Sequence, residues 1–212
     1  MVRSDIKEFV KTIPSDVTIV AASKYVNEED IKVLLDAGIN NIGENRVDSF
    51  LHKYELLKNE NVIWHFIGHL QRNKAKQVID KIDYLESLDS LELAKIINIT
   101  RLSPLKCFVE VSINLEENKN GVPYFELENF LKELKKYPNI EVVGLMMMTI
   151  KHSEEESLKE QFRKLRLLRD EMEQKLNMKL PYLSMGMSED YVEALEEGAT
   201  HIRLGRILFN LL

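Results

Sequence analysis

The chain has 212 residues, of which 44% are hydrophobic and 30% are charged, and this length suits one sizeable core. A formal net charge of −6 argues against a general nucleic-acid binder, and no apolar run approaches the length of a membrane span. Cys107 is the single cysteine, so no disulfide can form within the chain, and the charged first residues are unlike a signal peptide. We therefore expect a cytoplasmic protein without membrane contact.

Segments typical of strands and of helices alternate along the chain. A leading helix is predicted over residues 4–12, where apolar residues recur at helical spacing before Pro14. Eight predicted strands follow, at 18–25, 40–45, 62–68, 84–88, 105–113, 141–148, 182–185 and 201–205. Each precedes a predicted helix, at about 27–38, 47–57, 75–82, 89–97, 125–136, 154–177, 189–197 and 207–212.

This alternation over short connections predicts the fold. Eight strands and eight helices indicate an α/β protein, a single (β/α)8 TIM barrel with an extra N-terminal helix. We expect one domain spanning residues 1–212, because no linker or shift in composition divides the chain. The alternative is a doubly wound open sheet, although no glycine-rich dinucleotide fingerprint follows the first strand.

Lys24 stands at the end of the first predicted strand. The apolar run from Ile19 to Ala22 is typical of a strand buried on both faces. A lysine at the carboxyl end of such a strand lies where barrels place their chemistry, and partial burial would lower its pKa and favour a nucleophilic amine. This segment alone is also compatible with a lysine that simply extends to solvent.

Other polar residues gather at the same predicted strand ends. In chain order these are Lys24, Glu44 with Asn45, His65 with His69, Asp89, Asn114, Thr149, Ser184 to Ser188, and Arg203 with Gly205. The loops after the last two strands of a barrel, with a short helix N-terminus, form its usual phosphate site. The run from Ser184 to Ser188 fits that role or ordinary helix capping. With a lysine at the same mouth, it favours a phosphorylated carbonyl ligand, either pyridoxal phosphate or a sugar phosphate of an aldolase.

Arg203 and the two histidines leave alternatives open. A guanidinium beside a pyridine nitrogen would disfavour protonation of the ring, but Arg203 could equally pair with a neighbouring acid. His65 and His69 would share one face of a strand that runs into a loop, and the sequence nearby supplies no third metal ligand. We therefore expect no metal site, and expect His65 to pack in the core or against a bound ring.

Six motifs together resemble one family. They are Ala22–Tyr25, Gly43–Arg46, the stretch from Trp64 through Lys74, Gly144–Met146, Leu183–Ser188 and Ile202–Gly205. In this order they are similar to the pyridoxal phosphate homeostasis proteins, which are related to the N-terminal barrel of alanine racemase. The resemblance covers nearly the whole chain.

The resemblance implies roles for individual residues. Lys24 matches the lysine that forms the internal aldimine with pyridoxal 5′-phosphate. Ser184 and the backbone at Gly205 and Arg206 match the phosphate cradle, and Arg203 matches the partner of the pyridine nitrogen. The remaining two matches, Asn45 and His65, line the pocket.

The chain also departs from the family pattern. Relatives commonly have proline at the position of His69, and Thr-Ala-Ile-Phe-Gly where this chain has Arg206 to Asn210. The missing threonine removes one hydroxyl that could contact phosphate, while the backbone N–H remains and Arg206 adds charge. This departure bears on the affinity for the cofactor rather than on its identity.

The expected function is storage and delivery of a cofactor. Enzymes built on this barrel complete their active site with a second domain, and this chain ends at Leu212, directly after the eighth strand and a short helix. We expect a carrier of pyridoxal phosphate that passes it to apo-enzymes as a monomer or weak dimer, with no robust catalysis of its own. The alternatives are a racemase-like enzyme with an open site and, less favoured, a Schiff-base aldolase without cofactor.

Overall fold

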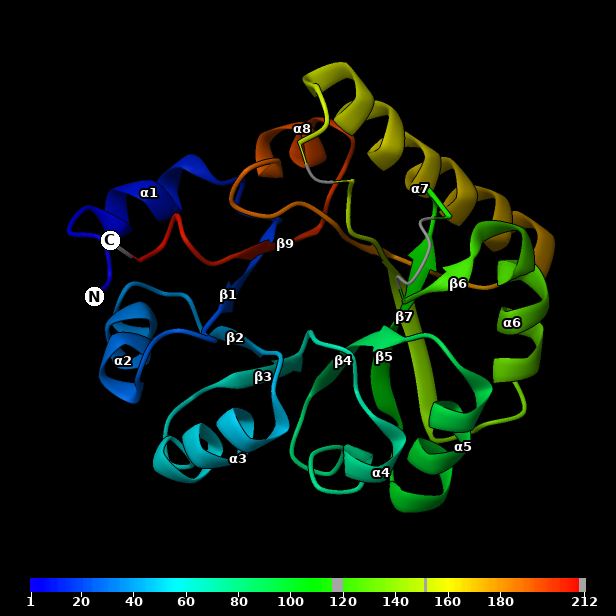
Figure 1. Cartoon of the computed structure of the whole chain (residues 1–212), viewed down its shortest axis with the longest axis horizontal. Helices are drawn as coiled ribbons and strands as arrows, with labels where there is room; N and C mark the ends of the chain where they lie inside the picture. Colours follow the sequence, from blue (N-terminus) through cyan, green and yellow to red (C-terminus); the bar gives the residue numbers. More distant parts are fainter. Residues whose placement is uncertain (116–119, 151, 210–212) are drawn as a thin grey trace.

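Eight parallel strands close into a barrel in the computed structural model, which describes residues 1–115, 120–150 and 152–209 (Figure 1). The strands are β1 (Thr18–Ala22), β2 (Asn41–Glu44), β3 (Ile63–Phe66), β4 (Tyr84–Leu88), β5 (Leu105–Ser112), β7 (Ile140–Met146), β8 (Tyr182–Ser184) and β9 (His201–Leu204). Neighbours pair in chain order, and the ring closes where Val20 of β1 lies opposite Arg203 of β9. The predicted (β/α)8 barrel is confirmed. A further strand, β6 (Val122–Pro123), pairs with the end of β5 outside the ring.

Helices surround the ring of strands, as Figure 1 shows. They are α1 (Ile6–Thr12), α2 (Glu28–Asp36), α3 (Val47–Leu56), α4 (Arg72–Ala75), α5 (Leu91–Thr100), α6 (Leu127–Leu134), α7 (Glu155–Leu176) and α8 (Tyr191–Glu196), with a 3-10 turn η1 (Tyr124–Glu126) before α6. Residues typical of helix caps stand at the ends of two of these helices. The Asn27 side chain accepts from the Asp30 backbone N–H at 3.0 Å, which caps α2, and Asn177 ends α7 in a left-handed conformation, at φ 45°.

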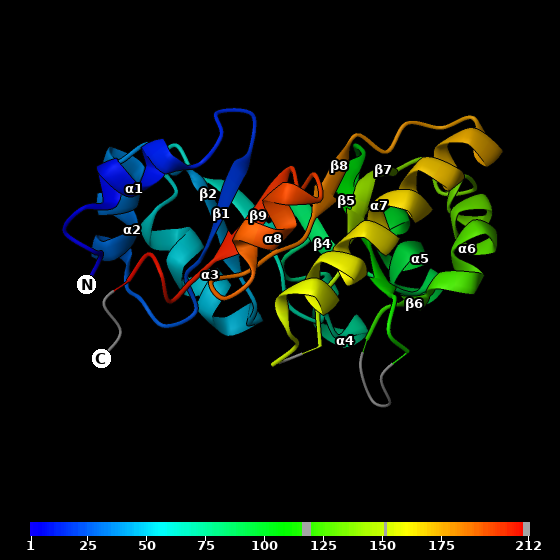
Figure 2. The same cartoon turned by 90° about the horizontal axis from the view of Figure 1, so that it is seen from above.

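The leading helix is confirmed, whereas the predicted closing helix over 207–212 is wrong for the described residues. After Gly205 the chain turns, and Phe209 forms an antiparallel bridge with Val2. The Arg3 backbone N–H donates to the Leu208 carbonyl at 3.0 Å. Figure 1 draws this last segment, in red, beside α1, and Figure 2 shows it near the N-terminus. Pairing with the start of the chain therefore takes the backbone groups that a helix would use, and Asn210 lies outside the described residues.

The predicted helix over 75–82 is also wrong beyond its first residue. Helix α4 ends at Ala75, and turns carry the chain on to β4. The apolar residues of that pattern, Val78 and Ile79, are nonetheless fully buried. The Arg101 guanidinium donates to the Ile79 carbonyl at 2.8 Å, so a long-range bond replaces a helical one.

No helix of the described residues is both long enough and apolar enough to cross a membrane. The single cysteine, Cys107, is buried in β5, and burial raises the pKa of its thiol well above the ordinary range. It is an inert core residue, as the apolar run around it predicts.

Candidate functional site

A cavity of about 290 Å³ opens at the carboxyl ends of β1, β7, β8 and β9. Four of the seven residues predicted for the site line it, namely Lys24, Arg203, Gly205 and Arg206. Ser188, from the loop after β8, lines it as well. The barrel therefore brings the two ends of the sequence to one place, because β1 and β9 are neighbours in the closed sheet.

Lys24 reaches the cavity from the rim. Strand β1 ends at Ala22, two residues earlier, so the Lys24 side chain is exposed rather than partly buried. Its Nζ lies 4.9 Å from the centroid of the Tyr25 ring, within the range of a cation–π contact. The primary amine is thus open to a ligand in the cavity.

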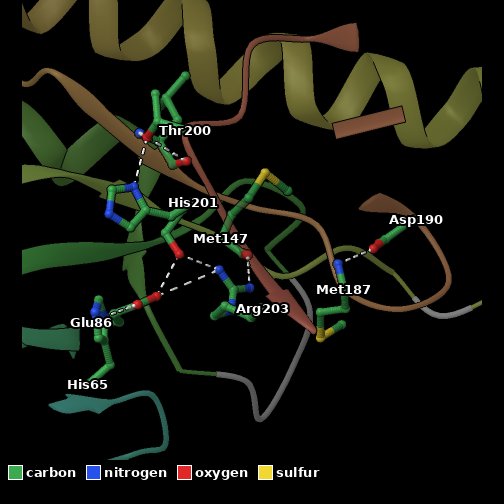
Figure 3. A network of polar contacts seen from close by, with 10 residues as sticks. His65, Glu86, Met147, Met187, Asp190, Thr200, His201 and Arg203 are labelled. Atoms are coloured by element: carbon green, nitrogen blue, oxygen red, sulfur yellow. Dashed lines mark hydrogen bonds and ion pairs between the residues drawn. The ribbon is translucent and has the colours of Figure 1, made fainter. Parts of the chain in front are cut away.

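Arg203 enters the cavity wall from inside the barrel and is 5% exposed. Its Nη1 donates to the Ser184 hydroxyl at 2.7 Å. Its Nη2 donates to the Met147 carbonyl at 2.8 Å, as Figure 3 shows. The Ser184 hydroxyl in turn donates to Glu86 Oε2 at 2.5 Å. Arg203 is thus linked to a buried acid, as one of the two alternatives predicted, and it also lines the cavity.

Glu86 is the buried counter-charge of this network. His65 Nδ1 lies 2.7 Å from Glu86 Oε1, and His65 Nε2 lies 2.9 Å from Asn41 Oδ1. Burial by itself raises the pKa of Glu86, but the hydrogen bond and charge of His65, the charge of Arg203 and the Ser184 hydroxyl together lower it to about 2. A carboxylate therefore persists beneath Arg203 at neutral pH.

Two other buried titratable groups lie near this network. Burial lowers the pKa of His201 to about 4, and the charges of His65 and Arg203 act in the same direction, against that of Glu86. Burial raises the pKa of Glu110 to about 7, the charge of Asp89 adds to this, and Arg203 opposes it. At neutral pH His201 is neutral, whereas Glu110 is divided between its two forms.

Donor groups meet on the β9 side of the cavity. The Ser188 hydroxyl accepts from the backbone N–H groups of Gly205 at 3.2 Å and Ile207 at 3.3 Å. Arg206 forms an exposed ion pair with Glu189, at 2.5 Å between Nη2 and Oε1. Hydroxyls, backbone N–H groups and guanidinium groups are donors that bind phosphate in proteins. In this structure the two N–H groups are bonded to Ser188 and the guanidinium to Glu189, so a phosphate would take the place of these partners.

The chain is similar throughout to known proteins. The family model for the alanine racemase N-terminal domain matches residues 3–212. The pyridoxal phosphate homeostasis protein of Aquifex aeolicus is 44% identical, over 90% of this chain and 85% of that protein. That of Synechocystis is 36% identical, over 95% and 94%. The chain belongs to the pyridoxal phosphate homeostasis family.

Solved structures agree with this family assignment. The structure of PipY from Synechococcus elongatus with pyridoxal phosphate bound matches with a TM-score of 0.89 and 29% identity, covering 96% of this chain and 99% of that one. Alanine racemase of Clostridium difficile matches with a TM-score of 0.81 at 16% identity, covering 98% of this chain and 57% of that one. The second match shows the shared barrel fold and no more.

The other three predicted site residues lie away from the cavity lining. Ser184 and His65 are fully buried beneath it, in the Glu86 network. Asn45 follows β2, and its Oδ1 is buried with no hydrogen-bond partner among the described residues. Gly68 packs so closely on Asn45 that a Cβ there would overlap its carbonyl oxygen. The serine of the loop after β8 that lines the cavity is Ser188, four residues after Ser184.

Sequence reasoning did not single out two buried charged residues near the cavity, Glu86 and Lys53. Glu86 lies in the buried strand β4 between Leu85 and Ser87, and Lys53 lies on the buried face of α3 with Phe50. A charged residue inside an apolar pattern was the available signal for both. The sequence did indicate the run from Ser184 to Ser188, but its spacing did not distinguish which of the two serines lines the cavity.

Proposed function

We propose that this chain binds pyridoxal 5′-phosphate covalently at Lys24 and holds it for delivery to apo-enzymes, as a component of vitamin B6 homeostasis. The observation that carries the proposal is one cavity that holds a primary amine, a buried guanidinium and a set of phosphate donors. The names of the relatives and the cofactor in PipY support it.

The residues present fit this cofactor. The cavity, at about 290 Å³, is close to the lower end of the range of ligand pockets. Three basic residues, Lys24, Arg203 and Arg206, and two acidic residues, Glu189 and Asp190, line it, so positive charges outnumber negative ones by one, which suits a phosphorylated ligand. We assign the phosphate to Ser188, Gly205 and Arg206, and the ring nitrogen to Arg203, with Ser184 acting through Arg203. When bound, the cofactor supplies an aldehyde, which condenses with the Lys24 amine to a C=N bond as the carbonyl oxygen leaves with two amine protons as water.

Arg203 is the reason to propose a carrier rather than an enzyme. Its guanidinium stays charged, and Glu86 faces it through Ser184, so no acid is offered to protonate a ring nitrogen at this position. An unprotonated ring is a weak sink for electrons, which disfavours loss of a substrate proton. Delivery to apo-enzymes by a monomer or weak dimer in the cytoplasm is the rest of the proposal, the compartment being inferred from the single cysteine.

Absorption spectroscopy tests the covalent site. Adding pyridoxal 5′-phosphate should produce a visible band, and borohydride followed by peptide mapping should place the label on Lys24. Lys24→Ala should abolish both results. Lys106→Ala is the matched control, because Lys106 is also exposed and stands 5.3 Å from a tyrosine ring, but at the opposite end of the barrel. Wild-type protein without a band after incubation would refute the proposal.

A second measurement separates the carrier from its rivals. A racemase-like enzyme would exchange the α-proton of an amino acid for deuterium in deuterated water, and this exchange would depend on Lys24. An aldolase of the Schiff-base type would cleave a sugar phosphate without any added cofactor. The carrier should do neither, and should restore the activity of a pyridoxal-phosphate-dependent apo-enzyme when it is loaded with cofactor.

A further inference from the structure

A buried ion pair lies directly behind Lys24, on the side away from the cavity. Lys53 Nζ stands 2.7 Å from Glu44 Oε2, and the two side chains are 6% and 0% exposed. Glu44 is the last residue of β2, and Lys53 lies in α3. Glu44 also accepts from the Asn45 backbone N–H at 2.8 Å and from the Ser49 hydroxyl at 3.1 Å. Both charges are therefore fully engaged.

The pair is joined to the residue that precedes Lys24. Lys53 Nζ donates to the Ser23 carbonyl at 2.5 Å, and the Ser23 hydroxyl lies 3.4 Å from Glu44 Oε2. The same carbonyl accepts from the Val26 backbone N–H at 3.1 Å, which closes a turn around Lys24. Lys53 thus holds the peptide bond between Ser23 and Lys24, which is where the exposed Lys24 side chain begins.

Stability alone explains this arrangement poorly. Taking an ammonium and a carboxylate out of water is costly, and apolar residues of similar volume are often at least as stabilising at such a position. The apolar neighbours of Lys53 on its helix face, Phe50 and Leu57, show that this face belongs to the core. A charged donor at this position supplies something that an apolar side chain lacks, namely a directed bond to the Ser23 carbonyl.

We propose that Lys53 is a positioning residue for Lys24, with Glu44 as the counter-charge that keeps it in place. Lys53 fixes the backbone under Lys24, so that the amine is presented to the cavity without the turn having to order first. Displacement of a reacting group by about 1 Å can lower reactivity about a hundredfold. This inference rests on the proposed covalent site at Lys24.

The test compares two variants that differ in the bond to Ser23. Glu44→Gln with Lys53→Met removes both charges and the donor, so no buried charge is left unpaired. Glu44→Gln alone removes the acid but keeps the Lys53 donor and an acceptor oxygen beside it. For the double variant we expect the dissociation constant of pyridoxal 5′-phosphate to rise by about tenfold or more, and borohydride labelling of Lys24 to fall. Glu44→Gln alone leaves the Lys53 charge without its counter-charge and should lower the free energy of unfolding, but because the donor to Ser23 remains, it should weaken cofactor binding less than the double variant does.

A control and an independent readout separate positioning from loss of fold. Glu197 is another buried acid in an ion pair, with Arg163 at 2.7 Å and Arg166 at 3.1 Å, at the far end of α8 from the cavity. Glu197→Gln should destabilise the fold without weakening cofactor binding. In wild-type protein without cofactor, the Val26 amide should already be protected from hydrogen exchange, and cofactor should add little protection.

The outcomes are distinct for the two proposals. Wild-type protein that never forms the visible band would refute the cofactor site itself. A normal wild-type band with equal affinity in the double variant would overturn the role of Lys53. If the double variant does not fold, hydrogen exchange of the wild-type protein tests the role of Lys53. Strong new protection of the Val26 amide on cofactor binding would show that the turn is not ordered before the cofactor binds. That result would also overturn the role of Lys53.

Discussion

Replacing Glu110 with glutamine should stabilise the protein at high pH far more than at low pH. Glu110 is 4% exposed on β5, next to Met146 of the neighbouring strand. Burial and the nearby Asp89 charge raise its pKa from the ordinary 4.5 to about 7, in spite of Arg203. The folded protein therefore holds this proton more tightly than the unfolded chain, and folding becomes less favourable as the pH rises from about 4.5 to about 7.

The size of the effect follows from that pKa. Raising it from 4.5 to about 7 corresponds to about 3 kcal/mol, at about 1.4 kcal/mol per pH unit. Glutamine is neutral at every pH and has a similar volume. The free energy of unfolding of Glu110→Gln, relative to wild type, should therefore increase by about 3 kcal/mol between pH 4 and pH 8.

Urea unfolding of both proteins, followed by tryptophan fluorescence at several pH values, measures this difference. Trp64 is the single tryptophan and is 4% exposed, so its emission should report loss of the core. Equal urea slopes for the two proteins would show that the same surface unfolds in each. A difference between variant and wild type that stays constant across this pH range would refute the reasoning, because it would mean that Glu110 titrates alike in the folded and unfolded protein.

Three other substitutions probe the core around the site. His201→Phe should make the free energy of unfolding less dependent on pH below neutrality. Folding lowers the His201 pKa from 6.5 to about 4, so the wild-type protein should lose about 3 kcal/mol of stability as the pH falls through that range, and the variant should not. Urea unfolding at several pH values would measure this difference. Ser184→Ala removes the hydroxyl between Arg203 and Glu86, and should lower the free energy of unfolding by about 1–3 kcal/mol and weaken cofactor binding in the same titration used for Lys24. Gly144→Ala would place a Cβ on the Tyr182 carbonyl of the adjacent strand, and should cost about 3 kcal/mol; an unchanged melting temperature would contradict this close approach.

Local patterns were sufficient for most of the barrel. The long helix α7 follows a stripe that includes Leu158, Phe162 and Leu165, and the strands follow apolar runs bounded by turns. Predictions from residue spacing were wrong where backbone groups form hydrogen bonds with residues far away in the sequence. Val78 and Ile79 have helical spacing but lie in a run of turns, where the Arg101 guanidinium donates a hydrogen bond to the Ile79 carbonyl. Phe209 pairs with Val2, at the other end of the chain.

By itself, the sequence determined the order of the eight barrel strands and, to within a few residues, where each strand ends. That was enough to bring Lys24 and Arg203 to one mouth, since parallel strands of a barrel end on the same side. Only the tertiary structure decided that Ser188 rather than Ser184 lines the cavity, that Glu86 lies beneath Arg203, and that Lys53 bonds to the residue before Lys24. Strand periodicity sets which face a side chain takes, but hydrogen bonds between residues far apart in the chain depend on how the barrel closes.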